Sequence, residues 1–332
     1  MYKVFIFRKD DLNDATSFYV DIIINVLKEN NEECEIVYSI NQISKGDKVI
    51  VITLPAFLSV WKHNPKQDIT IWFQGIVPEE CYLTFSGIKK YWKVLYNSLL
   101  ELFVLNKATR IFFVSKAMKE HYEKKYRYRK DNFVIMPCFN QELMEKSFYD
   151  KRYASPSFVY AGSLAEWQCV EETLRLYTTI SQEIPNTTLT LLTREEERAF
   201  ELLGKYGIQN AEVKYVPYYE LNQELSKYKY GFLLRRDIKV NNVATPTKMN
   251  SYMSCGIIPI YSNVIGDFKE VLKDIKYKIE VTSVDDTILQ LKQLESIKID
   301  KDSILSEYKE LFSNYYSVGS YEQKIKNIFH IK

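Results

Sequence analysis

Short apolar runs rich in β-branched and aromatic residues recur along the chain and alternate with longer amphipathic stretches. The short runs indicate buried strands, and the stretches between them have the apolar spacing of helices. This alternation is typical of βαβ units, in which helices cover a parallel sheet. In the first half we expect strands at 2–7, 35–39, 48–54, 69–73, 111–115 and 133–136, and helices at 15–29, 87–107 and 116–126.

The same alternation starts again in the second half. There we expect strands at 158–161, 189–192, 213–216, 230–234, 257–261 and 277–281, and helices at 170–184, 194–206, 219–228, 247–255, 267–273 and 285–294. The chain ends in helical patterns over 302–329. The apolar stretch 49–61 contains Pro55 and is too short to span a membrane, so we interpret it as a strand with the turn that follows.

These patterns predict an α/β protein with two Rossmann-like domains whose parallel sheets face each other across a cleft. We expect an N-terminal domain at 1–145, a polar linker at 146–157 and a second domain at 158–300. The C-terminal helices at 301–332 are expected to pack back toward the N-terminal domain. Because ligands of open α/β sheets bind beyond the carboxyl ends of the strands, two such sheets suit an enzyme that joins two substrates.

Composition narrows the class of protein. The chain has 332 residues, of which 46% are hydrophobic and 27% charged, as expected for soluble domains. Its five cysteines form no CxxC pair, so we expect reduced thiols in a cytoplasm. Its three histidines lack the spacing of metal ligands, and we expect no bound metal. The first residues lead directly into a strand pattern, and we expect no secretory signal.

Positive charge is concentrated in one segment. The net charge is only +2, but residues 86–130 carry twelve Lys and Arg against three Glu. This imbalance favours an anionic partner such as a lipid surface or a phosphate. Basic and aromatic residues mix over 88–105, which fits peripheral membrane contact through 86–130. The alternative is a core helix with a basic edge. Since no recognition motif accompanies the charge, we expect no nucleic-acid partner.

The most informative polar residues follow a buried strand of the second half. That strand ends in Arg235 and Arg236, and a polar loop leads to Thr245, the expected N-cap of a helix. Lys248 lies in the first turn of this helix, where its charge opposes the helix dipole. A bound phosphate would explain a cation there, because helix N-termini attract anions. The alternative is an ordinary strand–loop–helix with surface arginines.

A family resemblance rests on the same segment. Residues 246–259 read PTKMNSYMSCGIIP and resemble the PxKxxEYxxxGxP signature of retaining GT-B glycosyltransferases of the family-4 type, which capsule, O-antigen and exopolysaccharide clusters encode. Residues 158–169, FVYAGSLAEWQC, resemble the opening strand of that family's donor domain. Residues 112–118, FFVSKAM, resemble its xxVSxxM stretch, and residues 69–80 resemble a loop that borders its active site.

The resemblance implies a GT-B fold and a retaining transfer from a nucleotide-diphosphate sugar. It implies that the nucleotide-sugar is a co-substrate and that no protein nucleophile is obligatory. We expect no cofactor, and no metal is required if Arg and Lys stabilise the leaving diphosphate. The donor nucleotide and its diphosphate are then held by the C-terminal domain. The donor-binding candidates are Gly162, Ser163, Arg235, Arg236, Thr247, Lys248 and Ser251.

Several charges of the family's donor site are replaced here. The family's Arg after the glycine is Ser163, and its Lys falls near Gln168. The two glutamates of its E-x7-E motif, the second of which would bind ribose hydroxyls, align with Val243 and Ser251. We expect the two arginines and the lysine named above to supply the missing positive charge. Fixed cations aimed at a leaving diphosphate stabilise the transition state of sugar transfer.

The resemblance places acceptor-facing groups in the N-terminal domain. The family's active-site His is replaced by Gln74, our catalytic candidate, whose amide can position the transferred sugar; a simple turn residue is the alternative. The acceptor-side candidates are Asn13, Asp14 and Glu79, and Glu79 or Glu80 is a candidate general base. The alternatives are helix capping by Asp14 and a solvated loop around the two glutamates.

We therefore predict a glycosyltransferase of surface polysaccharide synthesis that acts on a saccharide or lipid-linked acceptor, in the cytoplasm at the inner face of the membrane. The alternatives are a catalytically inactive partner or chaperone of another transferase, and a sugar-nucleotide epimerase on the same fold. Asp300 and Asp302 form a DxD pattern, which marks metal sites in the other transferase architecture. We interpret this pattern as the N-cap of a C-terminal helix or as a solvated loop.

Overall fold

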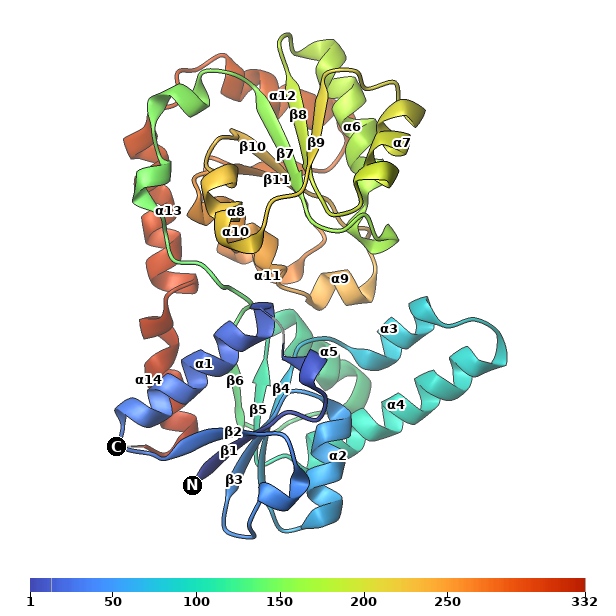
Figure 1. The fold of residues 1–332 in the computed structure, drawn as a ribbon, viewed down its shortest axis with the longest axis vertical. Coiled ribbons are helices and arrows are strands. Elements are labelled where there is room, and N and C mark those ends of the chain that lie inside the picture. Colours follow the sequence, from blue (N-terminus) through green and yellow to red (C-terminus); the bar gives the residue numbers. More distant parts are fainter. Residues whose placement is uncertain (13, 332) are drawn as a thin grey trace. The chain divides into compact units, whose positions relative to one another are not determined.

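The computed structural model describes residues 1–12 and 14–331 and divides the chain into two compact units. Unit 1 comprises Met1–Asn140, Asn242–Thr245 and Ser317–Lys332. Unit 2 comprises Gln141–Asn241 and Pro246–Tyr316. Each unit has one six-stranded sheet, and every strand pair described in both sheets is parallel (Figure 1). The α/β fold predicted from the apolar pattern is confirmed.

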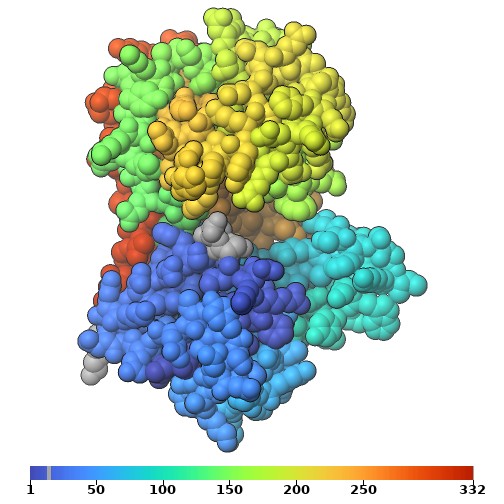
Figure 2. Space-filling view, in the orientation of Figure 1, coloured from blue at the N-terminus to red at the C-terminus, as the bar shows by residue number. Residues whose placement is uncertain are grey.

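The sheet of unit 1 has the strand order β2-β1-β3-β4-β5-β6. Its strands are β1 (Tyr2–Phe5), β2 (Cys34–Val37), β3 (Lys48–Val51), β4 (Asp68–Phe73), β5 (Arg110–Phe113) and β6 (Phe133–Ile135). The helices are α1 (Asp14–Glu29), α2 (Leu54–His63), α3 (Val77–Thr84), α4 (Gly87–Lys107), α5 (Lys116–Tyr126) and α14 (Val318–Phe329), with short 3-10 helices η1 (Lys9–Asp11) and η2 (Ile40–Gln42). Helices α3 and α4 project beyond the rest of this unit as a hairpin (Figure 1, Figure 2).

The sheet of unit 2 has the strand order β12-β11-β10-β7-β8-β9. Its strands are β7 (Ser157–Ala161), β8 (Thr188–Leu192), β9 (Ala211–Lys214), β10 (Tyr230–Leu233), β11 (Ile258–Ser262) and β12 (Ile279–Val281). Its helices are α6 (Val170–Glu183), α7 (Glu196–Lys205), α8 (Tyr218–Leu225), α10 (Thr247–Ser254), α11 (Gly266–Val271), α12 (Val284–Glu295) and α13 (Lys301–Tyr315), with 3-10 helices η3 (Glu145–Ser147), η4 (Asp150–Tyr153) and η5 (Glu166–Gln168). A further short helix, α9 (Lys239–Val243), lies across a boundary between the units.

Three α-helices of the described chain were not expected from the sequence. The interpretation of 49–61 as a strand and turn was wrong, because β3 ends at Val51 and α2 begins at Leu54. The Thr53 Oγ1 atom accepts a hydrogen bond from the Ala56 N–H at 3.3 Å, and Pro55 lies in the first turn, so both residues start the helix. Helix α3 replaces the solvated loop that was the alternative for Glu79 and Glu80, and α9 lies in the expected polar loop.

Thr245 does not cap α10, and this expectation was wrong. Pro246 occupies the N-cap position of α10. The Thr245 Oγ1 atom instead accepts a hydrogen bond from the Cys138 N–H at 2.9 Å and donates one to the Val114 carbonyl at 3.3 Å. The Ser115 hydroxyl also donates to the Val243 carbonyl at 2.6 Å. These bonds join residues 242–245 to unit 1, because all of their partners belong to that unit.

The segment expected as a linker packs inside unit 2, and the last helix packs inside unit 1. The buried Arg152 guanidinium donates to the carbonyls of Ser147, Cys255 and Tyr228. In unit 1, the Phe329 ring of α14 lies 5.4 Å from the Tyr2 ring, centroid to centroid. At α13, the Asp300 carboxylate accepts hydrogen bonds from the N–H groups of two first-turn residues, which confirms it as an N-cap.

Gly231 allows α10 to lie against the sheet of unit 2. A Cβ atom at position 231 would lie 2.7 Å from the buried Tyr252 ring and 2.8 Å from the Ile257 side chain. We therefore expect Gly231→Ala to lower the free energy of unfolding by about 1–3 kcal/mol, the usual cost of overpacking. Urea denaturation followed by circular dichroism measures the change.

The matched control is Gly204→Ala in α7, where an added Cβ has no heavy atom within 4 Å. Alanine is favoured over glycine in a helix, so this variant should be about as stable as the wild type or up to about 1 kcal/mol more stable. Equal effects of the two substitutions would contradict the packing role of Gly231.

Candidate functional site

Two neighbouring strands of unit 2 bring the donor-binding candidates to one edge of the sheet. Strands β7 and β10 pair in parallel, so their carboxyl ends meet, and Gly162 and Arg235 follow these ends. The Tyr252 hydroxyl of α10 accepts a hydrogen bond from the Ala161 N–H at 3.0 Å and donates to the Phe232 carbonyl at 3.3 Å. The first turn of α10, with Lys248, is thereby held at the same edge.

Arg235 and Lys248 meet at one side-chain amide. The Gln168 Oε1 atom accepts a hydrogen bond from Arg235 Nη2 at 2.9 Å and one from Lys248 Nζ at 3.3 Å. Lys248 Nζ also lies 4.2 Å from the centroid of the Tyr160 ring. No carboxylate among the described residues forms an ion pair with either cation. We call these two side chains the Arg235–Lys248 pair.

The surrounding protein opposes both of these positive charges. Burial and the nearby charge of Arg235 lower the pKa of Lys248 well below its ordinary value. Burial also lowers the pKa of Arg235. Two partly buried cations that lack a carboxylate partner raise the energy of the unliganded site. An anion bound beside them would remove that cost, so the electrostatics of this edge favour an anionic ligand.

Glycine at position 162 leaves space next to the lysine. Its φ of +141° lies in a region that favours glycine, and a Cβ there would be 3.3 Å from Lys248 Nζ. The neighbouring Ser163 is exposed, and its carbonyl accepts a hydrogen bond from the Tyr160 hydroxyl at 2.6 Å. The backbone after β7 therefore borders the Arg235–Lys248 pair without filling the space beside it.

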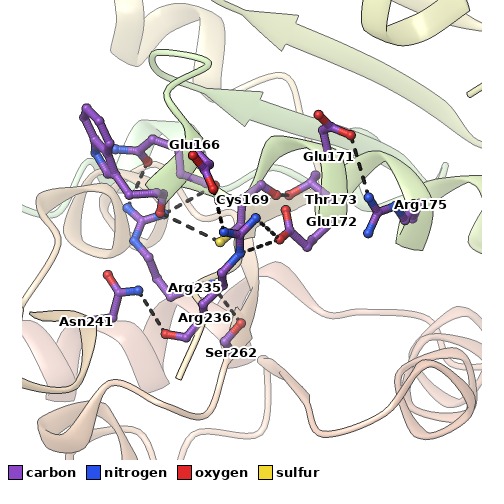
Figure 3. Close-up of polar contacts among 12 residues, drawn as sticks. Glu166, Cys169, Glu171, Glu172, Thr173, Arg175, Arg235, Arg236, Asn241 and Ser262 are labelled. Carbon is purple, nitrogen blue, oxygen red and sulfur yellow. Dashed lines mark hydrogen bonds and ion pairs between the residues drawn. The ribbon is translucent and has the colours of Figure 1, made fainter. Parts of the chain in front are cut away.

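Arg236 has different surroundings, as Figure 3 shows. Its guanidinium forms ion pairs with Glu166 at 2.9 Å and Glu172 at 2.7 Å, and half of the side chain is exposed. Hydrogen bonds to these two carboxylates raise the pKa of Arg236. Of the three cations predicted to bind the donor, the structure joins Arg235 and Lys248 through one partner and gives Arg236 carboxylate partners of its own.

Thr247 and Ser251 lie on the first turns of α10. The Ser251 hydroxyl donates to the Thr247 carbonyl at 3.2 Å. The N-cap residue Pro246 has no side chain that can accept a hydrogen bond from the first N–H groups of the helix. The N-terminus of α10, beside Lys248, therefore presents donors and a positive partial charge to an anion.

Sequence reasoning did not select Gln168 as a site residue, although its side chain links the two cations. The signal was present, because the resemblance aligned this position with a lysine of the family's donor site. Because Gln168 is neutral, we interpreted this position only as the loss of the family's positive charge. Its role as an acceptor depends on η5 placing Gln168 next to Arg235 and Lys248, which the sequence pattern does not give.

Unit 1 has a cavity at the carboxyl edge of its own sheet. Its volume is about 610 Å³, and it is lined by residues that follow β1, β3 and β4. The polar lining residues include Arg8, Asp10, Asp11, Thr53, Gln74 and Glu80. Gln74, the catalytic candidate, is therefore a cavity residue directly after β4. This is the edge at which ligands of open α/β sheets bind.

The two glutamates of α3 have opposite environments. Glu79 accepts hydrogen bonds from Lys125 at 2.9 Å and contacts His121 at 3.3 Å, and it is absent from the described lining of the cavity. Although burial acts in the other direction, these contacts lower the pKa of Glu79 to about 2. Burial raises the pKa of Glu80, which lines the cavity. Glu80 is thus better suited than Glu79 to accept or donate a proton there.

The remaining acceptor-side candidates are Asn13 and Asp14. Asn13 lies outside the described residues. Asp14 is the first residue of α1, and its side chain is likewise outside the description. Within residues 1–12 and 14–331, no group of three or more His, Cys, Asp or Glu side chains is placed to hold a metal ion. No helix of the described chain has the length and apolarity needed to cross a bilayer.

Comparison with known proteins gives a match in structure alone. No known family model and no curated protein matches the sequence. A sucrose-phosphate synthase from Thermosynechococcus elongatus has a TM-score of 0.72 at 11% identity, over 99% of this chain and 98% of that chain. Trehalose-6-phosphate from E. coli, solved with bound UDP-2-fluoro glucose, has a TM-score of 0.64 at 10% identity, over 95% of this chain and 78% of that chain.

A mutant of S. aureus TarM, solved with fondaparinux, alpha-GlcNAc-glycerol and UDP, has a TM-score of 0.62 at 10% identity. The match covers 86% of this chain and 56% of that chain, so this chain spans little more than half of TarM. At these identities the likeness concerns the fold. With its two parallel six-stranded sheets, the chain has the GT-B fold of these glycosyltransferase structures.

Proposed function

We propose that this chain is a glycosyltransferase whose unit 2 binds the diphosphate of a nucleotide-sugar at the Arg235–Lys248 pair. The observation that carries the proposal is a pair of cations, held at the carboxyl edge of a parallel sheet, whose shared side-chain partner is a neutral amide. Two fixed positive charges beside a helix N-terminus match the charge of a diphosphate. The glycosyltransferase structures with the same fold support this choice of ligand.

The same residues suit the chemistry of sugar transfer. Breaking the bond between sugar and phosphate develops negative charge on the leaving diphosphate, and preorganised cations stabilise that charge in the transition state. We propose that Arg235, Lys248 and the N–H groups of α10 supply this stabilisation in place of a metal ion. We further propose a retaining transfer without a protein nucleophile, by analogy with the family that residues 246–259 resemble.

We propose that the cavity of unit 1 receives the acceptor. Hydroxyl groups of a saccharide can pair with the carboxylates and amides that line it. In this proposal Gln74 positions the transferred sugar and Glu80 accepts or donates a proton. A saccharide or lipid-linked saccharide of surface polysaccharide synthesis fits this polar lining. The UDP and saccharide ligands of the TarM structure are consistent with such a donor and acceptor.

The donor site is tested by removing its charges one at a time. Loss of one charge-assisted contact to phosphate costs about 1.5–3 kcal/mol, so Arg235→Ala and Lys248→Ala should each weaken binding of UDP about tenfold or more. Arg236→Ala is the matched control, because Glu166 and Glu172 already neutralise Arg236. The affinity of this variant for UDP should stay within about threefold of the wild type. Isothermal titration calorimetry with UDP and GDP measures these affinities. Unchanged binding in both Arg235→Ala and Lys248→Ala would refute the proposed site.

Proton uptake gives a second test. The free protein holds the pKa of Lys248 well below its ordinary value, and a bound diphosphate should raise it again. Binding should therefore take up protons, and affinity should fall as the pH rises through the pKa of the free lysine. Titrating UDP at pH 8 in HEPES and in Tris, which have different ionisation enthalpies, measures the uptake. In Lys248→Arg, binding should persist without this uptake, since arginine stays charged.

Turnover tests the acceptor cavity separately from the donor site. We expect Glu80→Gln to lower kcat about a hundredfold or more if its carboxyl group transfers a proton, while UDP affinity stays unchanged. Glu79→Gln is the control, because the Glu79 carboxylate is paired with Lys125 and lies outside the cavity lining. This variant should change kcat little. The assay follows transfer from UDP-, GDP- and dTDP-sugars to glycan acceptors. Saturable nucleotide binding without any turnover would instead favour an inactive partner of another transferase.

A further inference from the structure

The first half of α4 carries an exposed apolar stripe. Ile88, Trp92, Leu95 and Leu99 follow one another at intervals of four, three and four residues, which places them on one face of the helix. Their exposed fractions are 77%, 67%, 52% and 60%. Tyr91 and Tyr96 flank the stripe and are 66% and 57% exposed. We call these six side chains the α4 stripe.

The same helix is buried in its second half. Leu100, Val104 and Leu105 belong to the core of unit 1, and the Phe103 ring lies 4.8 Å from the Trp61 ring of α2. The alternative of a core helix therefore describes only the second half, because the first half, which carries Lys89, Lys90 and Lys93, exposes its apolar side chains. The first half extends past the helices that cover the sheet (Figure 1). Large apolar side chains gathered on one exposed helix face favour an interaction surface.

A buried carboxylate fixes the base of this hairpin. Glu101 of α4 is fully buried and accepts hydrogen bonds from the Val77 N–H of α3 at 3.1 Å, from the Tyr122 hydroxyl at 3.1 Å and from the Tyr126 hydroxyl at 2.8 Å, both of α5. The Lys125 ammonium group lies 3.5 Å from the same carboxylate. Helices α3, α4 and α5 are thereby joined at one point, so the α4 stripe is presented on an anchored helix.

The charged residues in the first half of α4 are all positive. Lys89, Lys90 and Lys93 lie between residues 86 and 100, a stretch without Asp or Glu. Among the described residues these lysines form no ion pair and contact the rings of Tyr82 and Phe85, at 4.0 Å from Lys90 to Tyr82.

Farther along the basic segment, many cations are already neutralised. Lys119 pairs with Glu123 at 2.7 Å, and Arg110 pairs with Asp68 at 2.6 Å. The three lysines beside the stripe, like Lys107, Lys124, Arg127 and Lys130, form no ion pair with a carboxylate in the described chain. At this end of α4 the unpaired charge lies beside exposed apolar side chains, a combination that suits an anionic, partly apolar partner.

We propose that the α4 stripe docks on a lipid bilayer that contains anionic headgroups, with Trp92, Leu95 and Leu99 in the interfacial region. Tryptophan and tyrosine favour the level of the headgroups, where their apolar rings and polar groups are both satisfied. Lysines at the flank attract anionic lipid. A second copy of the chain fits less well, because pairing two such faces brings two sets of unpaired lysines together. This inference rests on the surface of unit 1 and does not depend on donor binding in unit 2.

Vesicle flotation of the full chain tests the proposal. The probes are phosphatidylcholine vesicles with and without phosphatidylglycerol, at low and high salt. We expect the wild type to float with the anionic vesicles and to bind less at high salt, since salt screens the lysines. The variants Trp92→Ser/Leu95→Ser and Lys89→Glu/Lys93→Glu should each bind at least tenfold less. Phe200→Ser, which removes a 57% exposed ring from α7 of unit 2, is the matched control and should float like the wild type.

Further measurements keep the result interpretable. Circular dichroism and UDP affinity, which reports on unit 2, should be unchanged in the stripe variants, and Arg235→Ala/Lys248→Ala should float like the wild type. Failure of the donor site would thus leave flotation intact. The proposal is overturned if the wild type does not bind anionic vesicles, or if the stripe variants bind as well as the wild type does. It is also overturned if sedimentation shows a dimer that Trp92→Ser/Leu95→Ser dissociates while vesicles do not compete with it.

Discussion

The electrostatic repulsion between Arg235 and Lys248 is the interaction on which the interpretation of this molecule depends. The fold holds two like charges against one amide oxygen, and each element involved has a separate reason for its position. Parallel pairing of β7 and β10 sets the edge, Gly231 lets α10 approach the sheet, and the Tyr252 hydroxyl fixes that helix to two strands. A folded protein keeps unfavourable contacts of this kind mainly where a ligand relieves them.

Much of the fold could be predicted because buried parallel strands are continuous apolar runs, which are easily recognised in a sequence. The twelve strands of the described chain were all expected near their observed positions. The missed helices α2 and α3 each have a proline in the first turn. The first segment was interpreted as a strand with its turn, and a solvated loop was the alternative for the second. Thr245 shows a second limit. The local sequence suggests that its side chain caps the first turn of α10. Its hydroxyl instead pairs with the backbone of Cys138 and Val114, which are distant in the sequence.

The candidate site was predictable only in part. Cations at a strand end and in a first helical turn are visible in the sequence, but their partners are not. Glu166 and Glu172 lie far from Arg236 in sequence and neutralise it, whereas no such partner reaches Arg235 or Lys248 in the described chain. Glu79 and Glu80 are neighbours in sequence, yet helix geometry points one toward His121 and Lys125 and leaves the other at the cavity. Distinctions of this kind need the fold.

The bonding of residues 242–245 to unit 1 has a consequence for how the molecule can be divided. The backbone passes from one unit to the other after residues 140, 241, 245 and 316. Neither half is therefore one uninterrupted stretch of polypeptide, and no single cut releases either of them whole. A recombination event that exchanged residues 141–316 for those of a relative would also replace residues 242–245. The new residues would then have to form the hydrogen bonds that join this stretch to Ser115 and Cys138. Selection on the two halves is consequently linked through four residues.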